Sequence, residues 1–416
     1  MTRRRGGESP LAGSDRRGGV VRSTQRERRL FLAVLGFLTF ASVYATVVVA
    51  PVITQIAGEF DISTGTAGLL VAAYGAPGIV VSLIVGPFSD RSGRKRFLVA
   101  GSACMGLFTL LSALATSFLV LIALRVVAGI GAAMIFPNTS ATIGDTFPYR
   151  DRGRAMSTVI GFNTMASIVG VPTAGIVAEA TSWRISLALV GALCLVASTV
   201  LYLLLRTTHT ATTESRFFEL YKSILRSRSA VAATISSFLG SLFWFTWSTY
   251  IVVFFESVYG LTRGTAATFA LTLGLGVFIG SQIGGRLGDR IGHKPVVAGA
   301  IVISAVLLVA LTNTSLPLVA GAALNLLLST VIGARFATNQ TLMTEQMPRA
   351  RGTLLALSSS TIGLAIVLAA SIGGLLIDTF GFRAVGIFCG AAALASATIV
   401  IAFVREEPVN LEIVAA

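Results

Sequence analysis

The sequence predicts an all-α integral membrane protein in which twelve transmembrane helices form two six-helix bundles related by pseudo-twofold symmetry. Three observations carry this prediction: a composition without a polar exterior, twelve apolar runs of spanning length, and a second half that repeats the first. Of the 416 residues, 54% are hydrophobic and only 12% are charged, whereas a soluble domain carries about 25% charged residues. So few polar residues cannot cover a soluble fold of this length, and lipid is the expected solvent.

The apolar runs have the length that a bilayer requires. A membrane-crossing helix needs about 20 apolar residues, and backbone groups in lipid must pair within helices or closed barrels. The apolar–polar alternation of barrel strands is absent from the sequence. The first run is too long for a signal peptide and is expected to be retained. The expected spans are 30–54, 66–89, 97–115, 118–143, 155–178, 185–205, 229–255, 264–286, 296–313, 316–343, 353–377 and 383–404.

Basic residues gather in alternate loops, and this pattern predicts the orientation. If both termini share one side, that side holds 27 of the 32 Lys and Arg residues, nine of them before Leu30. The other side holds three, Arg184, Arg263 and Arg383. The positive-inside rule then makes both termini cytoplasmic, in a multi-pass protein of the cytoplasmic membrane. The basic tail favours anionic lipid headgroups, and no nucleic-acid partner is expected.

The two halves resemble each other at an offset of 199–200 residues. Gly86–Lys95 corresponds to Gly285–Lys294, and Glu179 corresponds to Asp378. Six spans in each half indicate a parallel repeat about an axis along the membrane normal. The expected organisation is a basic tail at 1–29, bundles at 30–205 and 229–404, a cytoplasmic linker at 206–228, and a tail at 405–416.

The loop after the second span carries a motif. It reads Gly86-Pro-Phe-Ser-Asp90-Arg91-Ser-Gly93-Arg94-Lys95. This run resembles the signature Gly-x-x-x-Asp-Arg-x-Gly-Arg-Arg/Lys of the major facilitator superfamily, and the resemblance covers nearly the whole chain. Arg125 and Gly129 match the Arg-x-x-x-Gly pattern that the family carries in its fourth span.

The fifth span carries Gly170, Pro172 and Gly175. Proton-driven drug exporters of the superfamily have a Gly-x-x-x-Gly-Pro-x-x-Gly-Gly run at this place, in which three glycines are here replaced by other residues. The form Gly-Val-Pro-x-x-Gly is more similar to the corresponding run in the 12-helix drug- and sugar-efflux branch of the superfamily. This is the branch of the drug:proton antiporters, and the resemblance favours export. The alternative is a proline kink with small-residue packing that binds no substrate.

The resemblance implies a cytoplasmic latch between the bundles. Asp90 would face the N-terminus of span 353–377, where the helix dipole favours a carboxylate. Arg94 would pair with Asp145, and His293 or Lys294 would pair with Glu345 in the second half. The alternative is a basic loop that only sets topology, with solvated ion pairs worth about 0–1 kcal/mol each. The expected latch residues are Gly86, Asp90, Arg91, Gly93, Arg94, Asp145, Asp289, Arg290 and Glu345.

Polar and aromatic residues within the spans are candidates for substrate binding or coupling. Arg125 and Arg335 are the basic residues inside spans, and burying a guanidinium costs at least about 2.5–3.5 kcal/mol. Such a residue faces a wet cavity or a partner, or is held by backbone carbonyls. Aromatic residues in 229–255 either stack on a substrate or pack in the protein. The candidates are Tyr44, Arg125, Asn163, Trp247, Tyr250, Asn325, Arg335 and Asn339.

All 18 acidic residues fall in loops, tails or span ends. Proton coupling therefore has to use an end-of-span carboxylate, such as Glu179, Glu256 or Asp378, or the proton of the substrate itself. Cys104, Cys194 and Cys389 lie in apolar runs and act as small hydrophobic residues. Neither His209 nor His293 has a second metal ligand close in the sequence, so no metal site is expected. No cofactor is expected beyond a proton as the coupling ion.

These observations predict a secondary active transporter that exports a drug-like or metabolite substrate in exchange for protons by alternating access. A Gly-Lys dipeptide is absent from the sequence, which excludes a Walker A loop, and no constellation of catalytic residues suggests an enzyme. The alternative is uptake or facilitated diffusion of an organic anion at Arg125 and Arg335. A lipid translocator and a non-transporting sensor are further alternatives. The expected partners are the substrate and membrane lipids, and the expected state is a monomer.

Overall fold

The computed structural model describes residues 25–147, 149–205, 217–347 and 351–406, and every regular element in these ranges is a helix. The predicted all-α fold class is therefore confirmed. The first half contains α1 (Gln25–Val47), η1 (Ala50–Val52), α2 (Ile53–Glu59), α3 (Thr64–Gly75), α4 (Pro77–Ser92), α5 (Arg94–Ser112), α6 (Phe118–Ala133), α7 (Ile135–Thr146), α8 (Tyr149–Ala180) and α9 (Trp183–Leu204).

A short helix, α10 (Phe217–Arg226), precedes the second half. That half contains α11 (Arg228–Tyr259), α12 (Arg263–Phe269), α13 (Leu271–Ile291), α14 (His293–Asn313), α15 (Leu318–Gln346), α16 (Arg351–Phe380) and α17 (Phe382–Phe403). Four expected spans are divided rather than continuous, namely 30–54, 66–89, 118–143 and 264–286. Pro51 and Pro77 explain the first two breaks, because proline cannot donate a backbone hydrogen bond inside a helix. Nothing in the sequence explains the break between α12 and α13.

Eleven helical stretches in the described ranges are long and apolar enough to cross a membrane. The twelfth expected span is α5, which begins with Arg94, Lys95 and Arg96 and is 19 residues long. It packs along α6 and α9 like the other spans. Large apolar side chains such as Leu119 and Val319 are exposed on the outer surface of the bundles, as a lipid-facing surface requires.

Serine caps begin several of these helices. The side chains of Ser63, Ser117, Ser182 and Ser227 each accept a hydrogen bond from a backbone N–H in the first turn of the following helix. Such a cap pairs a donor that has no partner within the helix. Gly93 and Gly292 precede α5 and α14 with φ angles of 91° and 96°, which only glycine adopts readily. The two halves thus use the same turn at equivalent positions.

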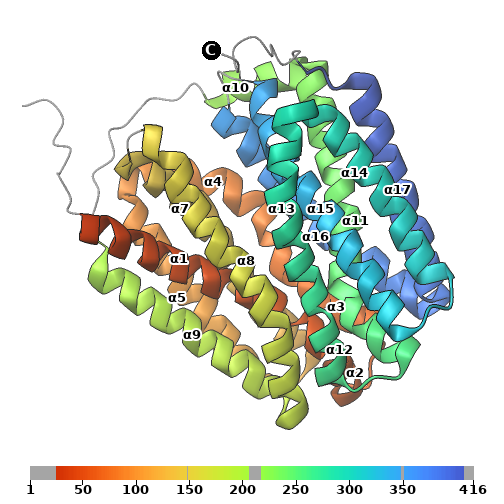
Figure 1. The fold of residues 1–416 in the computed structure, drawn as a ribbon. Helices are drawn as coiled ribbons and strands as arrows, with labels where there is room; N and C mark the ends of the chain where they lie inside the picture. Colours follow the sequence, from red (N-terminus) through yellow and green to blue (C-terminus); the bar gives the residue numbers. More distant parts are fainter. Residues whose placement is uncertain (1–24, 148, 206–216, 348–350, 407–416) are drawn as a thin grey trace, which may run out of the picture.

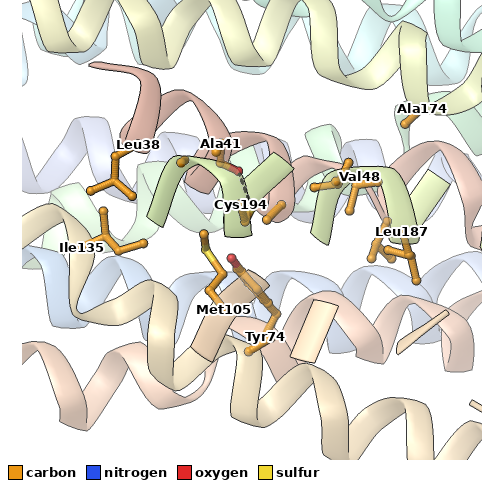
Figure 2. Packing of buried hydrophobic residues seen from close by; sticks show 14 of the residues in the cluster. Leu38, Ala41, Val48, Tyr74, Met105, Ile135, Ala174, Leu187 and Cys194 are labelled. Carbon is orange, nitrogen blue, oxygen red and sulfur yellow. Dashed lines mark hydrogen bonds between the residues drawn. The ribbon is translucent and has the colours of Figure 1, made fainter. Parts of the chain in front are cut away.

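Each half has its own hydrophobic core. The first core is built almost entirely from residues between Val34 and Leu205, and the second from residues between Phe243 and Ala397. Figure 2 shows part of the first core, where the Cys194 thiol donates to the Ala41 carbonyl oxygen at 3.4 Å. We call α1–α9 the N bundle and α11–α17 the C bundle.

The bundles meet through a few helices (Figure 1). α1, α5 and α9 form one side of the molecule, α14 and α17 form the other, and α3, α8, α13 and α16 lie between them. We call the end that carries α10 and the turns at Gly93 and Gly292 the linker face. The other end, which carries α2, α12 and the turns at Ser63 and Gly381, is the opposite face.

Candidate functional site

The two bundles touch most closely near the opposite face. On α3, a Cβ atom added at Gly65 would lie 2.4 Å from the Gly374 carbonyl oxygen of α16. On α8, a Cβ atom added at Gly175 would lie 2.3 Å from the Ala267 Cβ of α12. Side chains larger than glycine cannot fit at these two crossings, so the absence of a side chain is what lets the bundles close here.

Two carboxylates bridge the bundles at the same face. Asp378, near the end of α16, accepts hydrogen bonds from the Ser63 hydroxyl at 2.6 Å and from the Gly65 N–H at 3.0 Å. Glu179, near the end of α8, accepts one from the Gly264 N–H. Each carboxylate therefore caps the first turn of a helix in the other bundle, where the free N–H groups and the helix dipole favour negative charge.

These two contacts are equivalent under the internal repeat. Glu179 and Asp378 are 199 residues apart, as are Gly65 and Gly264. The N bundle thus supplies a carboxylate at one contact and the capped helix at the other. We call the pair of contacts the opposite-face gate, defined by Gly65 with Asp378 and Gly264 with Glu179.

A third group of polar side chains lies beside the Glu179 contact. Arg263 donates from Nη2 to the Thr54 hydroxyl at 3.2 Å, and its Nε lies 3.5 Å from Glu256 Oε1. Thr54 belongs to the N bundle, whereas Arg263 and Glu256 belong to the C bundle. Glu256 is half-buried and also lies within electrostatic range of Glu179. The ion pair of Glu256 and Arg263 therefore lies where the bundles meet, with Glu179 of the N bundle nearby.

Towards the linker face, α8 and α13 separate. Ile168 of α8 packs against Gly274 of α13, where an added Cβ would lie 2.7 Å from the isoleucine side chain. Closer to the linker face, Cβ atoms added at Gly161 and Gly285 would meet no atom within 4 Å. Figure 1 shows α8 and α13 side by side near the opposite face and apart towards the linker face.

The aromatic candidates of α11 are buried at the bundle interface or in the C bundle. The Tyr250 hydroxyl donates to the Ala370 carbonyl oxygen at 2.6 Å, and its ring packs within the core of the N bundle. The Trp247 indole N–H donates to Asn325 Oδ1 at 2.9 Å, and the Asn325 amide donates to the Thr272 hydroxyl at 2.6 Å. Trp247 and Tyr250 were expected either to stack on a substrate or to pack within the protein, and the contacts described here are packing contacts.

Arg125 lies fully buried inside the N bundle. Its Nη2 donates to the Ala45 carbonyl oxygen of α1 at 3.2 Å, and the guanidinium carbon lies 4.4 Å from the centre of the Tyr74 ring. Its Nε and Nη1 atoms have no hydrogen-bond partner among the described residues. A backbone carbonyl and an aromatic face thus supply the contacts of this cation.

Arg335 is buried in the same way inside the C bundle. Its Nη2 lies 3.5 Å from the Ser236 carbonyl oxygen, and its Nε has no partner in the described part of the chain. The Asn339 amide donates to the Ser237 hydroxyl at 2.9 Å, so both residues point to α11. Asn163 of α8 is half-buried, and its side-chain oxygen lacks a described partner.

The fifth-span motif packs α8 against α1 and α12. Gly170 faces Tyr44, whose ring would lie 2.9 Å from an added Cβ, and the Tyr44 hydroxyl is 2.6 Å from that of Thr173. Pro172 lies inside α8, and Gly175 makes the close approach to Ala267 described above. The motif therefore includes one of the glycines at which the bundles meet.

The latch residues at the linker face are described in part. Arg94 Nε donates to Asp145 Oδ2 at 2.5 Å, and His293 Nδ1 lies 3.1 Å from Glu345 Oε1, as the repeat predicts. Asp289 lies 3.7 Å from His293 Nε2, and Arg290 is exposed. Gly86, Asp90 and Arg91 are in α4, but their side chains are outside the described part of the chain. The contact expected for Asp90 is therefore not described.

Sequence reasoning missed the partners that make up the gate. Ser63, Gly65, Gly264 and Thr54 are small residues at helix starts and carry no chemical signal of their own. The alignment of the repeat pairs Glu179 with Asp378, but it does not show that each carboxylate reaches the other bundle. Gly65 and Gly264 are related by the same offset as Glu179 and Asp378, and this correspondence is the sequence signal that could have identified the two glycines.

Eleven candidate spans together with α5, packed around a core in each half and linked at the opposite face by symmetric polar contacts, describe the fold of a multi-pass membrane protein. The Major Facilitator Superfamily profile matches residues 32–283 and 264–415, and the chain belongs to this family. Members of this family are membrane transporters of small molecules.

Individual relatives match part of the chain. The probable sulfoacetate transporter SauU of Cupriavidus necator is 27% identical over 170 residues, which cover 41% of this chain and 40% of that protein. Multidrug resistance protein 2 of Bacillus subtilis is 27% identical over 161 residues, covering 38% and 40%. The matches thus span about two fifths of the length of these curated relatives.

A solved structure of a bacterial homolog to the human lysosomal transporter Spinster, in an inward-facing and occupied conformation, shares the fold. Its TM-score is 0.74 at 16% sequence identity, and the match covers 91% of this chain and 96% of that one.

Proposed function

We propose that this protein exports a drug-like or metabolite substrate across the cytoplasmic membrane in exchange for protons, as a monomer that works by alternating access. The linker face is assigned to the cytoplasm, because the turns at Gly93 and Gly292 lie there and belong to the loops and tails that together hold 27 of the 32 basic residues. In this orientation the structure is closed to the outside. The substrate then enters from the cytoplasm.

The opposite-face gate is the observation that carries the proposal. It consists of two symmetric sets of hydrogen bonds between bundles whose cores are built almost entirely from their own residues. Contacts of this kind can break and re-form as rigid bundles rock, since the hydrogen bonds within each helix stay intact. Opening towards the outside requires both sets to break.

Proton coupling is assigned to the carboxylates beside the gate. When this face closes, Glu256 of the C bundle, which pairs with Arg263, comes within electrostatic range of Glu179 of the N bundle. Like charges oppose each other, so bringing two carboxylates together favours a proton on the pair. Closing would therefore take up a proton from the outside, as an exporter driven by an inward proton gradient requires.

The test is export from proteoliposomes under an imposed proton gradient, with compounds that raise the thermal stability of the purified protein. Acid on the gate side should drive accumulation of such a compound against its gradient, whereas Glu256→Gln should permit exchange but abolish accumulation. Glu59→Gln is the matched control, because Glu59 pairs with Arg184 at 2.5 Å within the N bundle. Flux that ignores the proton gradient would reject antiport.

Transport of an organic anion is a second candidate, and the buried arginines favour it. Neither Arg125 nor Arg335 forms an ion pair with a described carboxylate, and both keep unpaired N–H donors. An anionic substrate would supply the missing charge once the bundles move. The partial match to a probable sulfoacetate transporter supports this candidate. A stability screen that yields only anions, with binding lost in Arg335→Gln, would favour it over drug export.

A further inference from the structure

A second group of titratable side chains surrounds His293 on the linker face of the C bundle. His293 begins α14 and is 9% exposed. Its Nδ1 atom lies 3.1 Å from Glu345 Oε1 of α15 and 3.5 Å from Glu406 Oε1 in the segment after α17. Its Nε2 atom lies 3.7 Å from Asp289 Oδ1 of α13. Carboxylates from three elements thus face the two nitrogens of one imidazole.

The same cluster fixes the chain after α17. Glu406 accepts hydrogen bonds from the backbone N–H groups of His293 and of Lys294, the latter at 2.9 Å. The Arg405 N–H donates to the Ser229 hydroxyl at 2.8 Å, and the Gln346 amide donates to the Arg405 carbonyl oxygen at 3.0 Å. The ends of α11, α14, α15 and α17 are therefore joined around His293.

The internal repeat provides a comparison within the molecule. His293 is 199 residues after Arg94, and Glu345 is 200 residues after Asp145. Arg94 pairs with Asp145 as His293 pairs with Glu345, and both pairs follow a glycine turn of the same conformation. Arginine keeps its charge at every physiological pH, whereas histidine changes charge between about pH 5 and 8. The two halves thus carry a fixed and a titratable version of one contact.

Other charges near His293 have defined positions. Lys294 follows it on α14, Arg290 is exposed in the last turn of α13, and the Arg405 side chain is exposed. The described ion pairs of the cluster all involve His293 itself. A neutral imidazole carries one N–H and can donate on one side only, whereas the doubly protonated ring donates on both. The charged ring therefore favours carboxylates on both sides at once, as Glu345 and Asp289 lie here.

We propose that His293 is a cytoplasmic proton sensor that holds the ends of the C-bundle helices and the segment 404–406 together when it is charged, and releases them when it is neutral. The assignment to the cytoplasm rests on the orientation proposed above. The Arg94 contact in the N bundle stays closed over the same range of pH. Alkaline cytoplasm would thus loosen one half of the linker face and leave the other unchanged.

The sign of the effect follows from the contacts. Protonated His293 attracts Glu345, Glu406 and Asp289, so the joined state is favoured at low pH. The charge of a histidine changes between about pH 5 and 8, so the attraction weakens as the pH rises through this range. The segment at Arg405 should therefore be held at pH 6 and released at pH 8.

A nitroxide label at position 405 tests the proposal without any transport measurement. Arg405 is joined to its neighbours through backbone atoms, so Arg405→Cys keeps those bonds. The buried cysteines Cys194 and Cys389, together with Cys104, are first replaced by alanine. Electron paramagnetic resonance spectra of the labelled protein in nanodiscs, with EDTA present, are recorded from pH 5.5 to 8.5. The mobile fraction should rise several-fold with pH.

Two substitutions separate a sensor from a structural contact. His293→Arg should keep the label immobile over the whole range, as the fixed charge of Arg94 would do. His293→Gln should leave the label mobile over the whole pH range without changing the fold of the protein. A flat profile in the native chain would overturn the proposal, as would a pH response that survives in His293→Arg. Immobilisation at pH 8 by added Zn²⁺, lost in His293→Gln, would also overturn it by showing a metal site.

This readout is independent of the transported substrate. If the label responds to pH as expected while proton gradients fail to drive export, His293 is a sensor in a carrier of another kind. If export follows the gradient and the label does not respond, the sensor is rejected and the antiporter stands.

Discussion

Replacing Gly65 with alanine should open the opposite face. The added Cβ atom would lie 2.4 Å from the Gly374 carbonyl oxygen and 2.3 Å from Asp378 Oδ2. The first neighbour is backbone and cannot rotate away, so α3 and α16 must move apart. Gly78→Ala is the matched control, because Gly78 belongs to the following helix and its added Cβ would meet no atom within 4 Å.

The size of the effect follows from the overlap. Forcing an extra methyl group into a packed contact costs about 1–3 kcal/mol. The cost falls only on the state in which this face is closed, because Gly65 and Gly374 separate when the bundles rock. A free energy of 1–3 kcal/mol changes the ratio of two states by about 5- to 150-fold. Alanine also favours helix by about 1 kcal/mol, a term that both variants share.

Distances between spin labels measure this ratio. Thr116 and Ser315 are exposed at the opposite face, one in each bundle, and can carry the labels. In Gly65→Ala the distance distribution should shift towards longer values, whereas Gly78→Ala should match the native protein. A Gly65→Ala distribution identical to the native one would refute the reasoning, since it would mean that the crossing at Gly374 does not limit closure.

Two further predictions concern the buried contacts of α11, and thermal unfolding in detergent checks both. Asn325→Leu should destabilise the C bundle by about 1–3 kcal/mol, because it leaves the Trp247 N–H buried without its acceptor; an unchanged melting temperature would contradict this. Tyr250→Phe should cost about 1 kcal/mol through loss of the bond to the Ala370 carbonyl oxygen. A gain in stability in Tyr250→Phe would show that this hydroxyl is not held as described.

The sequence predicted the spans well because their signal is local. Apolar runs of spanning length and loop charges mark each helix without reference to its neighbours, and the repeat groups the helices into two halves. The breaks at Ala76 and Met134 were not predicted, although Pro77 and Pro137 lie just after them, since proline inside a span often only bends it.

The site was predicted less completely because its contacts are long-range. Arg94 with Asp145 came from a family resemblance, and His293 with Glu345 came from the repeat. The reach of Asp378 to Ser63 depends on how two rigid bundles dock, and no pattern near either residue encodes it. Likewise Glu406 lies 113 residues after His293 in the chain, and only the fold brings them together.

Alternating access is tested most directly by joining the gate covalently. With the native cysteines replaced, Ser63→Cys and Asp378→Cys place two thiols where a direct hydrogen bond now joins the bundles. Oxidation should trap the closed opposite face and stop export of a substrate found in the stability screen, and reduction should restore the rate of the unbridged variant. Export by the bridged protein at the unbridged rate would contradict the account, because substrate would then cross without opening this face.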